Sequence, residues 1–248
     1  MNQACLLNTR PQHQAAGLSS LIKAAGFNVI ECPALRMATQ VCQTPPSWSQ
    51  QDVWVFVSRN AVVHFAEQLG HEPQGDARLV AVGAATAQAM IEKGWQKIEP
   101  LPQSFDSEGM LAMKVFSQPL GLKVGIVRGD GGREFLSESL GKSGAEVQFY
   151  EVYQRIIAPF CNQAWSRFKQ QDQAVILFTS KSSLDAFIQQ CPINDQAWYC
   201  RQPLIVFSQR IAEYARHQGF NGSIEVTANS SDQAVLDSFR LFLNRQGE

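Results

Sequence analysis

Short apolar runs recur along this chain, and a longer stretch with mixed polar and apolar positions follows most of them. Six runs are apolar or β-branched at nearly every position, a pattern typical of strands that are covered on both faces of a sheet. These predicted strands span residues 4–7, 53–57, 79–82, 124–127, 174–178 and 204–207.

The stretches after these runs carry apolar residues at helical spacing. Strand, turn and helix therefore alternate along the chain, which predicts parallel sheets with helices on their faces. The clearest helical sets are Leu18, Leu21 and Ile22, then Ala87, Met90 and Ile91, and finally Leu184, Phe187 and Ile188.

The pattern also repeats within the chain. Gly26 follows Arg10 at the same separation at which Gly144 follows Arg128. Three more landmarks recur in the same order: the Ser58 and Ser180 turns, the turns that open at Gly83 and Ser208, and the pairs Ser107-Glu108 and Ser231-Asp232. Chance similarity between common α/β patterns is the alternative. We favour two related halves of about five strands each.

Two similar α/β units in one chain usually frame a ligand site, and ligands bind where parallel strands end. The expected fold class is therefore α/β, with two parallel-sheet domains and a cleft between them. The residues that follow the predicted strands are the candidate binding residues.

Composition limits the class of protein. The chain has 248 residues, a net charge of −1 and 17% charged residues, so it offers no basic field for nucleic acid. We see neither a secretory signal nor an apolar run long enough to cross a membrane. The six cysteines form no CxxC pair, and we expect free thiols in a reducing cytoplasm.

The turn at residues 129–134 is glycine-rich but fails as a dinucleotide loop, because Glu134 stands where the third glycine would be. We expect its amides to favour a carboxylate instead. The histidines lack metal-ligand spacing, and the chain has neither a phosphate loop nor a GxSxG nucleophile motif. We therefore expect no metal and no cofactor.

Small polar residues lie at the predicted strand-to-helix junctions. Such residues cap helices, and capping alone could explain them. They could equally present hydroxyl and amide groups to a ligand, so both interpretations stay open. The junction residues are Ser58, Asn60, Gly83, Thr86 and Ser180.

An ordered set of segments along nearly the whole chain resembles the bacterial uroporphyrinogen-III synthases. The segments are TRP (9–11), FVSRNAVVHF (56–65), VGAATA (82–87), SEGML (107–111), VRGDGGRE (127–134), VYQR (152–155), FTSKSSLDAF (178–187) and SSDQAVL (230–236). The resemblance implies two flavodoxin-like domains that are joined by a two-stranded linker. Residues 1–36 and 156–248 would form the first domain, and residues 37–155 the second.

The resemblance also implies the reaction. Hydroxymethylbilane loses its hydroxyl group, ring D is attacked at its substituted carbon, and a spiro intermediate rearranges to the macrocycle with ring D inverted. Because this substrate also cyclises unaided to the wrong isomer, the enzyme mainly has to orient it. A cofactor-free site suits that task.

Tyr153 matches the family tyrosine that is proposed to assist departure of the hydroxyl group. One departure from the family pattern stands at Ile211, where a threonine is expected, so Ser208 or Arg210 would replace its contact. The substrate-binding residues that the resemblance and the junctions indicate are Arg10, Ser58, Asn60, Gly83, Thr86, Arg128, Gly129, Ser180, Lys181, Ser208 and Arg210.

The sequence therefore predicts a monomeric, cytoplasmic lyase acting on hydroxymethylbilane, with possible transient contact with the preceding pathway enzyme. A two-lobed small-molecule binding protein and a nucleotide-dependent transferase are the alternatives. We expect strand 4–7 to share a sheet with 174–178 and 204–207. We also expect replacement of Arg10, Lys181 or Arg210 by Ala to raise KM only several-fold, as for a partly exposed charge.

Overall fold

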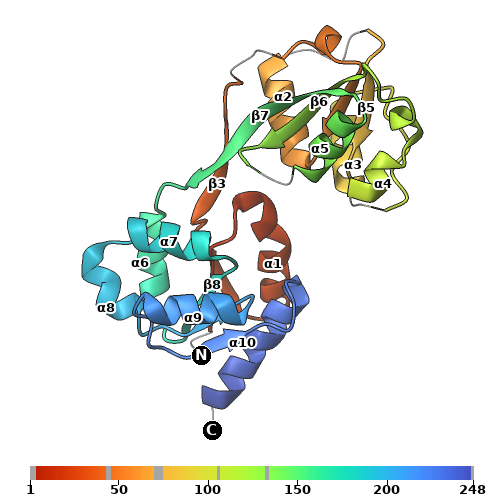
Figure 1. Cartoon of the computed structure of the whole chain (residues 1–248). Helices are drawn as coiled ribbons and strands as arrows, with labels where there is room; N and C mark the ends of the chain where they lie inside the picture. Colours follow the sequence, from red (N-terminus) through yellow and green to blue (C-terminus); the bar gives the residue numbers. More distant parts are fainter. Residues whose placement is uncertain (1–3, 43–45, 70–74, 105–106, 132–133, 247–248) are drawn as a thin grey trace. The chain divides into compact units, whose positions relative to one another are not determined.

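The computed structural model describes residues 4–42, 46–69, 75–104, 107–131 and 134–246 (Figure 1). The chain divides into two compact units. Unit 1 comprises Met1–Arg36 with Ile156–Glu248, and unit 2 comprises Met37–Arg155. No helix in the described residues is long and apolar enough to cross a membrane.

Unit 1 contains a five-stranded parallel sheet in the order β10-β9-β8-β1-β2. Leu7 of β1 lies between Ile30 of β2 and Ile176 of β8, so the expected pairing of the first strand is confirmed. The strands are β1 (Cys5–Asn8), β2 (Asn28–Glu31), β8 (Ala174–Phe178), β9 (Leu204–Val206) and β10 (Ile224–Val226).

Helices cover both faces of this sheet because alternate strand residues point to opposite sides. Leu6 packs in the cluster of α1 (Gln12–Ala24) and α10 (Asp232–Gln246). Leu7 packs in the opposite cluster. That second cluster includes residues of α6 (Asn162–Lys169), α7 (Lys181–Gln190), α8 (Gln196–Tyr199) and α9 (Gln209–His217), and a short 3₁₀ turn, η3 (Ile193–Asp195), precedes α8.

Unit 2 contains a second five-stranded sheet in the order β3-β7-β6-β4-β5. The pairs β7-β6, β6-β4 and β4-β5 are parallel. Ile98 adds a single parallel bridge beside Leu79 of β5. The strands are β3 (Leu35–Thr39), β4 (Val53–Phe56), β5 (Arg78–Ala81), β6 (Lys123–Gly129) and β7 (Glu146–Ile157).

One face of the second sheet is aromatic. Trp48, Trp54 and Phe65 are almost fully buried and stack edge-on or tilted against one another. This cluster includes residues of α2 (Arg59–Leu69), α3 (Ala84–Glu92) and the 3₁₀ turn η1 (Trp48–Gln50). The aliphatic cluster on the other face involves α4 (Ser107–Leu111), η2 (Lys114–Phe116) and α5 (Phe135–Lys142).

Strands β3 and β7 carry the chain from one unit to the other. The Gln40 amide donates to the Val152 carbonyl at 2.8 Å, and the Ala158 amide donates to the Ala34 carbonyl at 3.0 Å. From Ala34 to Gln40 the residue number rises, while the number of the hydrogen-bonded partner falls from 158 to 152. The two segments therefore run antiparallel. This is the two-stranded connection that the resemblance implied.

The sequence repeat is exchanged between the sheets. The first sheet takes β1-α1-β2 from the first half of the repeat and β8 to β10 from the second half. The second sheet takes β4 and β5 from the first half and β6-α5-β7 from the second. The prediction of parallel sheets with about five strands each is confirmed.

One expected boundary is wrong. The sequence placed Arg128 and Gly129 after a strand that ended at residue 127, but both lie inside β6. Strand β6 continues because β7 stays paired with it through a register shift that brings Gly129 opposite Tyr153. Residues 132 and 133 of the glycine-rich turn lie outside the described residues.

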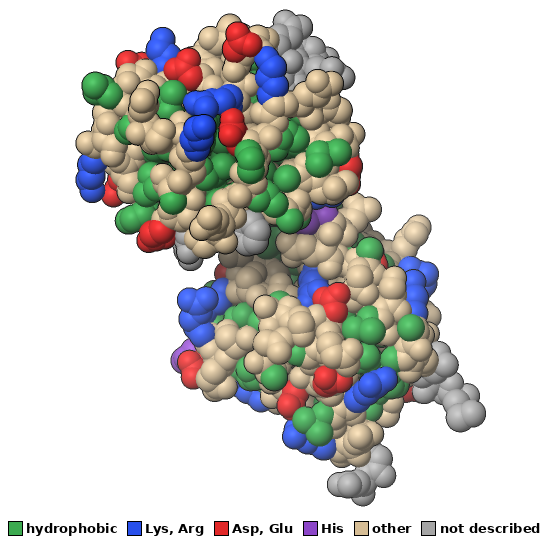
Figure 2. All heavy atoms as spheres, turned by 90° about the vertical axis from the view of Figure 1, so that its right-hand side faces the viewer, with side chains coloured by type: hydrophobic (Ala, Val, Ile, Leu, Met, Phe, Trp, Pro, Cys, Tyr) green, Lys and Arg blue, Asp and Glu red, His purple; other side chains and the backbone are tan. Residues whose placement is uncertain are grey.

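Charged side chains are interspersed on the face drawn in Figure 2, where acidic and basic groups of both units lie singly or in small groups. This distribution fits the net charge of −1. This face offers no broad positive field, so an anionic ligand would depend on local donors there.

Candidate functional site

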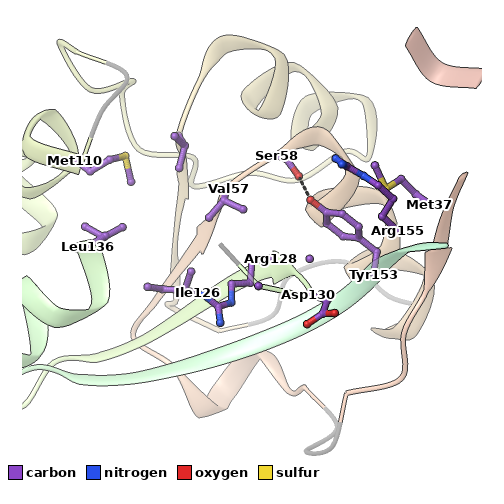
Figure 3. Close-up of a pocket in the computed structure, with 13 residues that line it drawn as sticks. Met37, Val57, Ser58, Met110, Ile126, Arg128, Asp130, Leu136, Tyr153 and Arg155 are labelled. Atoms are coloured by element: carbon purple, nitrogen blue, oxygen red, sulfur yellow. Dashed lines mark hydrogen bonds between the residues drawn. The ribbon is translucent and has the colours of Figure 1, made fainter. Parts of the chain in front are cut away.

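A cavity of about 530 Å³ opens in unit 2 where the parallel strands end (Figure 3). Val57 and Ser58 directly follow β4, Val82 follows β5, and Arg128 and Gly129 end β6. Parallel strands present their carboxyl ends at one edge of a sheet, the edge where such folds bind ligands. The cavity has the size of small-molecule sites in general.

The wall of the cavity is largely apolar, and sequence reasoning did not single out the residues that form it. They come from strand ends, the linker and two helices, so no short motif joins them. The apolar lining consists of Met37, Val57, Val82, Met110, Ile126 and Leu136. Such a wall suits a weakly polar ring and excludes water from it.

Tyr153 forms the polar end of the cavity from β7. Its phenol oxygen lies 3.0 Å from Ser58 Oγ, the contact drawn as a dashed line in Figure 3. The ring stacks on His64 at 5.5 Å between centroids. The ring also contacts Gly129, where an added Cβ would lie only 2.6 Å from Tyr153 Cε2. The tyrosine is therefore held in one place by three neighbours.

Ser58 fits both roles considered for the junction residues, helix capping and presentation of a hydroxyl group to a ligand site. Its Oγ accepts a hydrogen bond from the Ala61 amide at 3.1 Å, in the first turn of α2, and also meets the Tyr153 phenol at 3.0 Å. The hydroxyl thus caps a helix and faces the cavity at once.

Three charged side chains complete the lining. Arg128 is buried and donates to the Glu151 carboxylate. Asp130 and Arg155 are exposed, and neither was among the residues chosen from the sequence. Arg155 lies only two residues beyond Tyr153 on the same strand, so it shares that strand's face.

The other predicted residues of unit 2 lie apart from this lining. Asn60 is half-buried in α2, and Gly83 precedes α3. Thr86 is buried within α3, as is its repeat counterpart Ile211 within α9. Neither Asn60, Gly83 nor Thr86 is among the residues described as lining the cavity.

The predicted residues of unit 1 gather where the strands of its own sheet end. Arg10 follows β1, Ser180 and Lys181 follow β8, and Ser208 and Arg210 follow β9. Ser180 forms a capping box with Ser183 of α7, in which its Oγ accepts from the Ser183 amide at 3.1 Å.

These cations differ in exposure, contrary to the expectation that all three are partly exposed charges. Arg10 is only 6% exposed, pairs with Asp232 and faces the Phe207 ring at 5.2 Å. The Lys181 ammonium lies 4.7 Å from the Tyr214 ring centroid. Arg210 is exposed. Burial of Arg10 follows from its place just after β1, an inner strand of the sheet, and from its pairing with Asp232 at the start of α10.

The described residues contain no group of three or more His, Cys, Asp or Glu that could hold a metal ion. All six cysteines are free thiols, as expected. The cavity offers hydrogen bonding by a phenol and a hydroxyl, charge from two arginines and one aspartate, and an apolar wall.

A model of the family described as uroporphyrinogen-III synthase HemD matches residues 16–233 of the chain. This match spans most of both units. The chain belongs to the uroporphyrinogen-III synthase family. It is thus an enzyme of tetrapyrrole biosynthesis, a cyclising lyase, and the resemblance seen in the sequence is confirmed.

Two relatives in this family match most of the chain. The uroporphyrinogen-III synthases of Salmonella typhimurium and Escherichia coli K12 are each 29% identical to it over 242 residues, which is 93% of this chain and 98% of each relative. The crystal structure of uroporphyrinogen-III synthetase from Helicobacter pylori superposes with a TM-score of 0.59 at 15% identity and covers 98% of this chain and 99% of that one. This last likeness supports the fold alone.

Proposed function

We propose that the cavity of unit 2 is where the enzyme holds the reacting end of hydroxymethylbilane while it forms uroporphyrinogen III. The observation that carries this proposal is the Tyr153–Ser58 hydrogen bond of 3.0 Å at the polar end of a largely apolar cavity. Family membership supplies the reaction, and this cavity supplies groups that suit its first step.

The first step breaks the bond between the hydroxymethyl carbon and its oxygen. The pyrrole nitrogen pushes out the hydroxyl group, which leaves as water once its oxygen has gained a proton. The Tyr153 phenol donates a hydrogen bond to that oxygen. Ser58, held by the Ala61 amide, fixes the direction of the phenol. The pyrrole N–H proton, which is released as the neutral azafulvene forms, restores the proton that the phenol gave to the leaving water.

The second contribution of the cavity is orientation. The azafulvene that forms reacts readily with water or with the wrong carbon of ring D, so the groups that surround it determine which product forms. Apolar side chains such as Met110, Ile126 and Leu136 exclude water and restrict the folding of the chain of rings. Attack at the substituted carbon of ring D then gives the spiro intermediate and, after bond migration, the inverted ring.

The variant Tyr153→Phe tests this role. It keeps the ring that packs on His64 and Gly129 and removes only the donor, so the melting temperature should stay near that of the wild type. We expect kcat to fall about 10²-fold, the low end for positioned proton donation, with little change in KM. A stable variant with wild-type kcat would contradict the assignment.

Ser58→Ala is the companion variant. It leaves the phenol in place but removes its partner and one cap of α2, so we expect a smaller loss of kcat and a destabilisation of about 1 kcal/mol. An effect on kcat larger than that of Tyr153→Phe would point to Ser58 as the donor instead.

We further propose that units 1 and 2 are the two domains of a monomeric cytoplasmic enzyme whose only obligatory partner is hydroxymethylbilane. Transient contact with the enzyme that supplies this unstable substrate would limit its spontaneous cyclisation. Six free thiols fit a reducing compartment. Light scattering at working concentration tests the monomer.

A further inference from the structure

Arg128 is held more rigidly than a surface arginine would be. Its Nε and Nη2 atoms both donate to Glu151 Oε1, at 3.2 and 3.0 Å. The Phe149 ring lies 3.7 Å from the guanidinium carbon and covers one face of the group. A side chain fixed by two hydrogen bonds and a stacked ring keeps its remaining donors in a defined direction.

One of those remaining donors is buried without a partner. Arg128 is only 9% exposed, and its Nη1 atom makes no hydrogen bond. An unpaired buried N–H on a charged group is costly, and buried polar groups are otherwise almost always satisfied. Arg128 is one of the residues that line the cavity, so the group that carries this unused donor lies at the wall of a candidate ligand site.

We propose that Arg128 binds a carboxylate side chain of the substrate through this unused Nη1 donor, with Arg155 as a second cation at the same cavity. The proposal rests on the function proposed above, since hydroxymethylbilane carries one acetate and one propionate side chain on each pyrrole ring. It assigns one of those chains to a defined residue.

The charge of the site favours a carboxylate over a more highly charged anion. Glu151 already neutralises Arg128, so the pair attracts a ligand by a directed hydrogen bond more than by net charge. Asp130, exposed at the same cavity, would repel a dianion further. Exposed Arg155 restores one positive charge.

Unit 1 contains the same arrangement built from other residues. Its repeat counterpart, Arg10, is also buried, paired with a carboxylate and faced by an aromatic ring, and its Nη2 atom is also without a partner. The partners Asp232 and Phe207 do not occupy the repeat positions of Glu151 and Phe149. Both halves of the repeat therefore have a buried arginine with an unpaired donor, although different residues support it. This is expected if the donor has a function.

Two variants that should change KM in opposite directions test the proposal. Arg128→Gln removes the donor and should raise KM for hydroxymethylbilane about 10-fold or more, since a charge-assisted hydrogen bond is lost. Glu151→Gln keeps an oxygen that accepts from Arg128 but removes the negative charge, so it should lower KM several-fold. If Arg128 only stabilises the fold, both variants should lower the melting temperature, and KM should not rise in Arg128→Gln and fall in Glu151→Gln.

A direct binding measurement uses a monopyrrole with one acetate and one propionate chain, and its dimethyl ester as the matched control. Titration of the full-length protein should show that the diacid binds at least about 10-fold more tightly than the ester, that Arg128→Gln abolishes this preference, and that Glu151→Gln increases it. Equal binding of acid and ester by the wild type, or a preference that survives in Arg128→Gln, overturns the proposal.

The result is separable from the proposed function. If the wild type forms the type III isomer while Arg128→Gln keeps a wild-type KM, the carboxylate assignment is wrong and the activity stands. If the wild type gives only the type I isomer, the function itself fails, whatever the monopyrrole does.

Discussion

Arg10 is a buried member of an ion pair, and this decides what its replacement does. In Arg10→Ala the Asp232 carboxylate loses its partner and the Phe207 ring loses a neighbour. Because Asp232 is 38% exposed and can recover some hydration, we expect a loss of about 1–3 kcal/mol in the free energy of unfolding.

Denaturant unfolding measures this effect, and the exposed residue Arg210 provides the control. Arg210→Ala should change the free energy of unfolding by no more than about 0.5 kcal/mol. Equal stability of the two variants would show that the Arg10–Asp232 pair contributes nothing to the fold.

Cys161 is the cysteine whose reactivity should depend on pH near neutrality. The Cys32 thiol donates a hydrogen bond to it and lowers the pKa of Cys161 to about 7, while the pKa of Cys32 rises. Burial raises the pKa of Cys5 and of Cys191 to about 12. The thiolate is the nucleophile, so alkylation of Cys161 should be slow below pH 7 and fast above it.

Mass spectrometry after timed exposure to iodoacetamide gives this pH profile for each cysteine. In Cys32→Ala the midpoint for Cys161 should move up towards the value of an ordinary thiol, because the donor is gone. A midpoint that is unchanged by Cys32→Ala would refute the pairing of these two thiols.

At the scale of elements, the meeting of β6 and β7 positions the tyrosine. Gly129 lies opposite Tyr153 in the sheet, and a methyl group there would collide with the ring. Gly129→Ala should displace the phenol from Ser58 and lower kcat by about 10-fold or more, as loss of a positioned donor does.

Gly141 provides the matched control for this substitution. It lies in α5 of the same unit, and an added methyl group there has no atom within 4 Å. Gly141→Ala should leave kcat unchanged and raise stability by up to about 1 kcal/mol through helix propensity. Comparable kcat values for the two variants would contradict the role assigned to the β6–β7 contact.

The elements themselves were largely predictable, because buried parallel strands are apolar at every position and helices show their own period. The strands that the sequence missed have partly exposed or mixed faces. Strand β2 has no fully buried residue, and β7 alternates irregularly over its length. The extension of β6 to Gly129 depends on pairing with β7, which local pattern does not encode.

The site was less predictable than the elements because it depends on contacts between segments that lie far apart in the sequence. Ser58 and Tyr153 were each chosen from their own segments, but their contact joins residues 95 positions apart through three neighbouring strands. The apolar lining and Arg155 carry no chemical signature that separates them from ordinary core or surface residues. His64 was considered only as a metal ligand, whereas it packs on the tyrosine.

At the scale of the whole molecule, the internal repeat and the crossing strands explain why two similar sheets come from one chain. Each sheet needs strands from both halves of the sequence, so neither half can complete its sheet alone. We therefore expect residues 1–117 expressed as a separate chain to remain unfolded in circular dichroism, and residues 37–155 to fold. Folding of the first fragment alone would contradict the exchange.

The central claim is that this chain directs hydroxymethylbilane to the inverted macrocycle. The most direct measurement supplies hydroxymethylbilane with and without the protein, oxidises the products and separates the type I and type III isomers. We predict the type III isomer as the main product with the protein and the type I isomer without it. Only the type I isomer in both samples would contradict the account.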